Sequence, residues 1–265
     1  MSIGLSILSW RGAEALRPAL ESYQSIGFFD LFDEAQIYLP DPDKAVLGVA
    51  SKFVIETKTS PKNLGIMGNM IAAAEQLSTD YILMLENDCP LIEPLDEVKR
   101  QLKISIDLLE SKDVIMSRLR SVREPGQAFT GLGKYRRLYD GTLRSFFIRK
   151  FRRDHHRRLS GYALYDGQQS IERHTDHFEY VGDETYLVDA SIMPWTNQSI
   201  LINREFFLDK IIPMARSVKT RRHANSLPNL EIEMNKSRQW RRSGWKIACG
   251  PGLFTHERIG DRGYL

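Results

Sequence analysis

Cysteine is scarce in this sequence of 265 residues. Its two cysteines, Cys89 and Cys249, are too few for a disulfide framework and form no C-x-x-C pair that could hold zinc. Long apolar runs are also missing, since none approaches the roughly 18–20 residues that cross a bilayer. The apolar opening, residues 1–10, has no basic start and no small-residue cleavage site, so we interpret it as a first strand and not a signal peptide. We therefore expect a reducing, cytoplasmic setting.

A large excess of charge of one sign is absent as well: 37 Lys and Arg oppose 34 Asp and Glu, a formal net charge of +3. Basic residues nevertheless concentrate in residues 134–158, which hold ten Lys or Arg against two Asp. Such a stretch can bind a nucleic acid, an anionic membrane surface or a phosphorylated acceptor, or can be a solvated loop. A nucleic-acid-binding module also needs interleaved aromatics, and the stretch supplies Tyr135, Tyr139, Phe146, Phe147 and Phe151. Composition leaves its partner open.

Apolar residues make up 42% of the chain, enough for a full globular core. The first 120 residues alternate between two kinds of segment. Strand-like runs cover residues 3–9, 35–39, 53–57, 81–85 and 114–116, and helical spacing covers residues 12–26, 64–77 and 95–109. This alternation predicts right-handed β-α-β units and a mostly parallel central sheet flanked by helices, an α/β fold.

The pattern weakens over residues 121–176, where Gly-rich and Arg-rich stretches predict a long irregular basic segment. Regular signals then return. Strands are predicted at residues 178–181, 185–188, 199–203 and 245–248, and helices at residues 204–211 and 230–243. We expect a single domain over residues 1–265, with a small second β-region in its later half.

An acidic turn follows the apolar run at residues 81–85. Glu86, Asn87 and Asp88 come directly after this run, and Pro90 stops the strand. In an open α/β sheet, ligands bind outside the carboxyl ends of the strands. Mg²⁺ and Mn²⁺ prefer oxygen ligands and share them with substrate phosphates. The turn is thus a candidate metal–phosphate site, the alternative being that Asn87 and Asp88 only form a turn that caps the next helix.

This layout resembles the family 2 glycosyltransferases of the GT-A fold. Their first βα unit is followed by an Asn-x-Gly segment leading a helix, and then by an apolar strand that ends in Asp-x-Asp. Here Asn63-Leu64-Gly65 opens the helix, Asn69 follows, and the strand ends in Glu86-Asn87-Asp88. The resemblance covers residues 3–94. Because Glu86 stands where the family usually has Asp, Asp88 is the stronger candidate for a direct metal contact.

The resemblance implies a nucleotide-diphosphate sugar as donor, a UDP- or GDP-sugar, together with Mn²⁺ or Mg²⁺. It assigns residues 1–120 to the donor and residues 121–265 to the acceptor. The donor-binding positions that it implies are Ser9, Trp10, Arg11, Asp41, Asn63, Gly65, Asn69, Glu86 and Asn87. Alternatively, Arg11 is a surface charge and Asp41 the N-cap of a helix.

A carboxylate near the start of a late helix serves the family as catalytic base, and a Gly-aromatic-basic-Ile pattern and a histidine follow it. Here Glu231 and Glu233 precede Gly244-Trp245-Lys246-Ile247, and His256 follows. Inverting transfer needs a base on the face opposite the leaving diphosphate. The resemblance thus makes Glu231 or Glu233 the base, the alternative being that both only complement the helix dipole.

His256 is a candidate second metal ligand by the same resemblance, although a lone histidine is more often structural. Arg258 and Arg262 suit phosphate oxygens, because guanidinium binds them bidentately. Trp195 and Asn197 lie where the family faces its acceptor, so Trp195 is predicted to stack on a sugar ring and Asn197 to bond hydroxyls. Their alternative is a buried Trp with a capping turn.

Together these residues predict a metal-dependent, inverting transfer of one sugar to a glycan, lipid-linked or protein acceptor. Contact with an anionic membrane surface through residues 134–158 is a further expectation. A retaining GT-A enzyme, a nucleotidyltransferase acting on sugar phosphates and an inactive carbohydrate-binding relative are alternatives. A nucleic-acid-binding module is a different class, and it leaves the acidic turn and the late helix unexplained.

Overall fold

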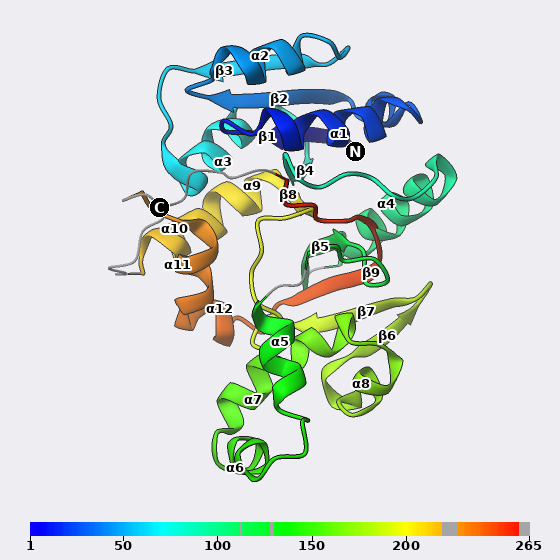
Figure 1. Cartoon of the computed structure of the whole chain (residues 1–265), viewed down its shortest axis with the longest axis vertical. Helices are drawn as coiled ribbons and strands as arrows, with labels where there is room; N and C mark the ends of the chain where they lie inside the picture. Colours follow the sequence, from blue (N-terminus) through cyan, green and yellow to red (C-terminus); the bar gives the residue numbers. More distant parts are fainter. Residues whose placement is uncertain (112, 128–129, 219–226, 260–265) are drawn as a thin grey trace.

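The structure is a computed structural model that describes residues 1–111, 113–127, 130–218 and 227–259 (Figure 1). Within them a nine-stranded sheet has the order β3-β2-β1-β4-β8-β5-β9-β7-β6. The strands are β1 (Ile3–Leu8), β2 (Glu34–Pro40), β3 (Glu56–Ser60), β4 (Tyr81–Glu86), β5 (Val114–Arg120), β6 (Glu179–Gly182), β7 (Thr185–Asp189), β8 (Ile200–Asn203) and β9 (Lys246–Phe254). The α/β class predicted from the alternation is confirmed.

Most neighbouring strands in the first half are parallel. β1 pairs in parallel with β2 and β4, and β2 pairs with β3. β8 runs antiparallel between β4 and β5, and β5 pairs in parallel with β9. The predicted second β-region is the antiparallel pair of β6 and β7, which joins the same sheet because β7 pairs with β9.

Helices cover both faces of the sheet. Those of the first half are α1 (Ala13–Gln24), η1 (Phe28–Leu31), α2 (Lys44–Ala50), α3 (Gly65–Glu75) and α4 (Leu95–Leu109). Alternate residues of β4 enter different cores: Ile82 and Met84 pack in one with α3, and Leu83 and Leu85 pack in the other with α1 and α4. Successive strand residues point to opposite faces. A strand buried on both faces is therefore apolar throughout, as this one is.

The segment predicted to be irregular, residues 121–176, is largely helical where the structure describes it. It contains α5 (Thr130–Arg137), α6 (Leu143–Phe151), α7 (Arg153–Ser160), η2 (Gly161–Tyr165), α8 (Gln168–Glu172) and η3 (Thr175–His177). Arginine favours helices, while Leu132, Tyr135 and Leu159 are buried against the core. The prediction was wrong because each helix is too short to show a clear period in the sequence.

Two later helices also differ from the prediction. The helix expected over residues 230–243 is divided into α11 (Leu230–Lys236) and α12 (Arg238–Arg242), because Ser237 is extended (φ −61°, ψ 125°) and its side chain accepts a hydrogen bond from Trp240 N. Residues 204–216 continue through α9 (Arg204–Phe206), η4 (Phe207–Ile211) and α10 (Ile212–Arg216). None of the helices described here is both long and apolar enough to cross a membrane.

Candidate active site

The carboxyl ends of β1, β2 and β4 meet at one edge of the sheet. Leu8 pairs with Tyr38 of β2 and with Glu86 of β4, so the residues after each strand emerge side by side. Ser9-Trp10-Arg11, Asp41 and the acidic turn therefore share one edge. This is the edge at which ligands bind in open α/β sheets.

Contacts from the α1 side hold the acidic turn in place. The Asn87 side-chain amide donates to the Gly12 carbonyl at 3.2 Å, and the Tyr23 hydroxyl donates to the Cys89 carbonyl at 2.5 Å. A methyl group on Gly12 would lie 1.9 Å from Asn87 Nδ2, so this close approach requires glycine. Glu86 ends β4 and is only partly buried. Asn87 thus links the turn to the start of α1.

The chain beyond β9 returns across this turn. His256 Nε2 lies 3.0 Å from Asp88 Oδ2, and the carboxylate is only 2% exposed. The backbone reinforces the contact, because Glu257 N donates to the Asp88 carbonyl at 2.9 Å and Thr255 N to the Pro90 carbonyl at 3.1 Å. The two residues predicted as metal ligands, far apart in the sequence, are therefore neighbours.

The spacing of Asp88 and His256 fits a hard divalent cation. Ligands about 2.1 Å from Mg²⁺ in adjacent octahedral positions are about 3.0 Å apart, and the observed Oδ2–Nε2 distance is 3.0 Å. Among the described residues no three His, Cys, Asp or Glu gather as a metal cluster. Oxygens from a substrate diphosphate and water would complete the coordination, as is usual for Mg²⁺ sites.

Two buried arginines lie on β5, and the sequence predicted a role for neither of them. Arg118 and Arg120 are each 5% exposed. The Arg120 guanidinium donates to Gln198 Oε1 at 3.0 Å and to the Gln127 carbonyl at 2.7 Å, and it interacts electrostatically with Asp88. The signal available was two arginines at alternate positions, on one face of a strand. It was missed because that strand was predicted to end at residue 116.

The two candidate bases on α11 have different surroundings. Glu231 retains accessible surface, whereas Glu233 is 4% exposed. Desolvation by the surrounding protein raises the pKa of Glu231, against the opposing effect of Arg118, Arg120 and His256. Glu231 therefore faces the groups around Asp88, and an acceptor can reach it. Both properties suit a base, since raised carboxyl pKa values make better proton acceptors.

Arg11 and Asp41 form an ion pair of 3.1 Å across the ends of β1 and β2. Both have left-handed backbones, φ 47° and 46°, which residues other than glycine adopt mainly where the surroundings impose them. The alternative assignment of Asp41 as a helix N-cap does not hold, because Asp43 caps α2 by accepting from Val46 N. Arg11 also lies over the Trp10 ring, 5.3 Å from its centroid. Ser9 is buried beneath them.

Asn63, Gly65 and Asn69 shape the loop that leads into α3. Asn63 Oδ1 accepts from Gly65 N at 2.9 Å and from Asn69 Nδ2 at 2.7 Å, and Asn69 Oδ1 accepts from Leu64 N at 3.1 Å. Gly65 has φ 74°. Because these side-chain amides bond to one another and to the backbone of the loop, they stabilise the conformation of the loop before α3.

The residues predicted to face the acceptor are buried. Trp195 is 1% exposed, its indole N–H donates to Asn197 Oδ1 at 2.9 Å, and its ring packs against Phe207 and Trp240. Asn197 is 2% exposed. A ring enclosed by other aromatics cannot stack on a sugar, so the acceptor assignment of this pair is corrected to a structural one. Arg258 is exposed two residues after His256, and Arg262 lies outside the described residues.

A mostly parallel sheet whose ligand edge carries an acidic turn is the GT-A fold of glycosyltransferases, and this chain has it. The mannosyltransferase PcManGT from Pyrobaculum calidifontis, in complex with GDP-Man and Mn²⁺, matches with a TM-score of 0.52 and 8% identity over 99% of this chain and 58% of that chain. S. aureus TarS 1–349 matches with a TM-score of 0.52 and 11% identity over 97% and 60%.

Glucosyl-3-phosphoglycerate synthase from Mycobacterium tuberculosis, in complex with Mn²⁺, UDP and phosphoglyceric acid, matches with a TM-score of 0.50 and 12% identity over 98% of this chain and 72% of that chain. No protein-family model and no curated protein matches the sequence. At these identities the structural likeness establishes the fold alone. This chain spans less than two thirds of PcManGT and of TarS.

Gly126→Ala tests whether the position of His256 determines metal binding. Gly126 has φ 71°, and a Cβ there would lie 2.2 Å from the His256 carbonyl oxygen. The added methyl group must displace His256 from Asp88, so we expect Mn²⁺ affinity to fall at least about tenfold. Electron paramagnetic resonance of free Mn²⁺, with and without UDP or GDP, measures this.

Gly133→Ala is the matched control, because a Cβ on this exposed residue of α5 meets nothing within 4 Å. It should bind Mn²⁺ as the unaltered protein does. Unchanged Mn²⁺ affinity in a folded Gly126→Ala protein would contradict a role for His256 in the metal site.

Proposed function

We propose that this protein transfers one sugar from a UDP- or GDP-sugar to an acceptor hydroxyl, with Mn²⁺ or Mg²⁺ held by Asp88 and His256. The observation that carries the proposal is the 3.0 Å contact of these two side chains at the carboxyl edge of a GT-A sheet. Two solved structures with this fold contain Mn²⁺ together with GDP-Man or UDP. A cation at this position would neutralise charge on the leaving diphosphate.

The donor nucleotide would lie along the ends of β1 and β2. The ion pair of Arg11 and Asp41 offers a guanidinium and a carboxylate to a base or ribose, and both groups remain exposed. Arg258, two residues beyond His256, is exposed and could contact the diphosphate bidentately. The loop held by Asn63 and Asn69 would border the same edge.

Glu231 is proposed as the base that removes the proton from the acceptor hydroxyl. Its raised pKa and accessible surface support this role, and its neighbours Arg118 and Arg120 would favour the carboxylate form. The hydroxyl oxygen would then attack the anomeric carbon as the bond to the diphosphate breaks. Direct displacement inverts the anomeric configuration, so we propose an inverting enzyme, with a retaining GT-A reaction as the alternative.

The acceptor is proposed to be a glycan, a lipid-linked sugar or a protein, and an exposed apolar face supports presentation at a membrane. Leu143, Phe146, Phe147 and Phe151 of α6 are each at least 49% exposed. Arg144, Lys150, Arg152 and Arg153 surround them, and α6 lies at the end of the molecule farthest from β3 and α2 (Figure 1). Aromatic residues interleaved with basic ones suit the interface of an anionic membrane.

A donor screen tests the reaction. UDP-, GDP- and dTDP-sugars are incubated with the protein, with and without Mn²⁺, and donor hydrolysis is followed by liquid chromatography. We expect hydrolysis of at least one donor only with the metal, and a loss of at least about 100-fold in Asp88→Asn, because the cation loses a ligand. Once an acceptor is found, Glu231→Gln should lower transfer by about 10²–10⁴-fold.

Glu205→Gln, which alters an exposed carboxylate on α9, is the control and should leave transfer unchanged. If no donor is bound or hydrolysed under any condition, the proposed function is wrong. If Glu233→Gln abolishes transfer while Glu231→Gln does not, the base is Glu233. Proton NMR of the product distinguishes inversion from retention.

The raised pKa of Glu231 also predicts a pH-dependent gain in stability on substitution. A carboxyl group whose pKa is higher in the folded than in the unfolded protein binds more protons when folded, so its contribution to stability is lost as pH rises through the folded pKa. Glu231→Gln should therefore melt above the unaltered protein at pH 7, by a small margin because solvent screens this exposed carboxylate. The difference should shrink below pH of about 4, where both states are protonated. Glu205→Gln is again the comparison, and equal differences at both pH values would contradict the shift.

Vesicle sedimentation tests membrane contact. We expect the protein to sediment with phosphatidylglycerol-containing vesicles and to bind phosphatidylcholine vesicles at least about tenfold more weakly, because the surface around α6 is basic. Phe147→Ser with Phe151→Ser should release it. Val54→Ser removes an apolar side chain that is 92% exposed elsewhere and should have no effect. Equal binding of both variants would rule out α6 as the docking face.

A further inference from the structure

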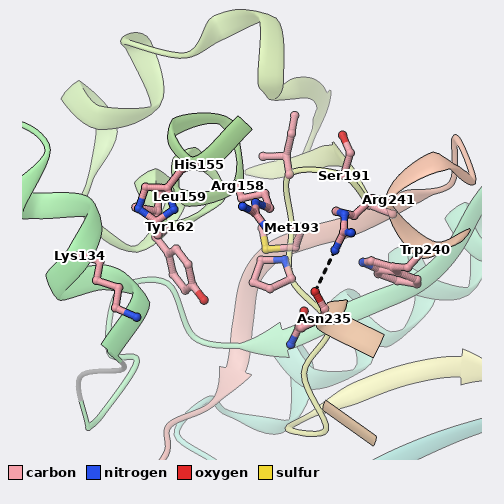
Figure 2. A pocket seen from close by; sticks show the side chains of 13 residues that line it. Lys134, His155, Arg158, Leu159, Tyr162, Ser191, Met193, Asn235, Trp240 and Arg241 are labelled. Carbon is pink, nitrogen blue, oxygen red and sulfur yellow. Dashed lines mark hydrogen bonds between the residues drawn. The ribbon is translucent and has the colours of Figure 1, made fainter. Parts of the chain in front are cut away.

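A pocket rich in arginine lies between α7, α12 and the segment that follows β7. One cavity of about 360 Å³ is lined by Lys134, His155, Tyr162, Asn235 and Trp240 among others, and an adjoining cavity of about 570 Å³ by Arg157, Arg238 and Arg242. Arg158, Ser191 and Arg241 line both. Figure 2 shows Lys134, His155 and Tyr162 on one side of the first cavity, and Arg241, Asn235 and Trp240 on the other. We call the two cavities together the arginine pocket.

Positive charge in the arginine pocket exceeds the negative charge that lines it. Its five arginines are Arg157, Arg158, Arg238, Arg241 and Arg242, and its one carboxylate is that of Asp154. Within the described ranges, no ion pair joins any of the five to a carboxylate. Burial and repulsion from Arg158, Arg238 and Arg242 lower the pKa of Arg241. An anion placed among these groups would relieve the repulsion.

Two residues that line the pocket have a buried polar atom without a hydrogen-bond partner among the described residues. Ser191 Oγ and Trp240 Nε1 are buried and make no hydrogen bond to any described residue. Buried polar groups are paired in most proteins, so a bound anion or water that reached these two atoms would supply partners that the described residues do not. Arg241 is fixed toward the pocket because its guanidinium donates to the Asn235 carbonyl at 3.1 Å (Figure 2).

The arginine pocket adjoins the proposed base. Asn235 follows Glu231 by one turn of α11, so the two lie on the same face of that helix. Tyr162 lines the pocket and interacts electrostatically with both Arg118 and Glu231. Arg118 itself donates to Met193 Sδ at 2.7 Å, and Met193 lines the first cavity. The arginine pocket and Glu231 therefore have Tyr162 as a common neighbour.

We infer that the arginine pocket binds a phosphate group carried by the acceptor, and holds it while the acceptor hydroxyl lies at Glu231. That the phosphate belongs to the acceptor rests on the proposed function, whereas the anion site itself does not. Guanidinium groups bind phosphate oxygens bidentately and remain charged at every physiological pH. The phosphate can belong to a small soluble molecule or to a lipid, and the chemistry at the pocket is the same.

The experiment measures phosphate binding without donor or metal. The full chain is titrated with inorganic phosphate and with glycerol 3-phosphate in EDTA at constant ionic strength, and calorimetry gives the dissociation constants. We expect saturable binding to one site, weakened at least about tenfold in Arg158→Gln with Arg241→Gln. Arg17→Gln with Lys52→Gln removes the same charge from exposed positions outside the pocket and should change binding less than about twofold.

Arg158→Lys with Arg241→Lys guards against loss of folding, because it keeps both charges while removing the guanidinium forks. It should weaken binding by an intermediate amount, and circular dichroism checks the fold of each variant. No saturable binding of either phosphate probe, or equal weakening by the pocket pair and the surface pair, would overturn the inference. Arginine-dependent binding of an oligonucleotide without binding of either phosphate probe would overturn it too.

Vesicles containing phosphatidic acid separate the two sources of phosphate. Vesicle binding that depends on Arg158 and Arg241 and that glycerol 3-phosphate does not displace supports a lipid phosphate. Displacement supports a soluble one. Because these titrations contain no nucleotide sugar, they can succeed when the donor screen fails, which would leave the anion site standing and the proposed function wrong. Donor hydrolysis without phosphate binding would reject the arginine pocket and leave the proposed function standing.

Discussion

The contact between Asp88 and His256 joins the two ends of the candidate active site. Asp88 belongs to the turn after β4, and His256 to the segment that follows β9. An almost fully buried carboxylate is unfavourable unless a charged or hydrogen-bonding partner compensates it, and His256 Nε2 at 3.0 Å supplies that partner. The same contact brings the chain after β9 against the acidic turn. Without it, the turn would hold only one of the two proposed metal ligands.

Buried polar contacts elsewhere maintain this geometry. Gln101 of α4 both donates to the Gly252 carbonyl and accepts from its N–H, at 3.1 and 3.0 Å, which fixes the end of β9. Arg120 is held by carbonyl groups of residues 125 and 127 and by Gln198. Its guanidinium therefore remains near Asp88 and interacts with it electrostatically. The site therefore combines a buried acidic turn with buried basic side chains.

The sequence predicted the sheet well where each element is long and its environment is simple. The strand β4 was predicted correctly because burial on both faces gives a continuous apolar run. The helix α4 was predicted correctly because burial on one face gives apolar residues at helical spacing. The helices of residues 130–160 were not readable, since each is short and many of their arginines face solvent. Arg118 and Arg120 were missed because their strand was predicted to end at residue 116, before either arginine.

For the site, the sequence predicted Asp88 and His256 as candidates through family resemblance, and their proximity agrees with that pairing. It could not separate Glu231 from Glu233, because neighbouring helix positions differ in burial only through tertiary packing. Trp195 illustrates the opposite error. An aromatic residue beside polar ones is typical of sugar recognition, yet here Asn197 accepts its indole N–H within the core. The local sequence shows that polar residues lie near Trp195, but it does not show whether the indole ring is buried or exposed.

The place of β8 in the sheet has a consequence for how the chain folds. β8 (Ile200–Asn203) lies between β4 and β5, and β5 has no neighbours other than β8 and β9 in the described sheet. During synthesis β5 is therefore made long before either strand that pairs with it. A protein ending near residue 120 would have an unpaired, mostly apolar edge on β4 and an isolated β5, both prone to aggregation. Strands from residues 1–120 and from the later half of the chain therefore share one sheet, and its strand β8 is synthesised late.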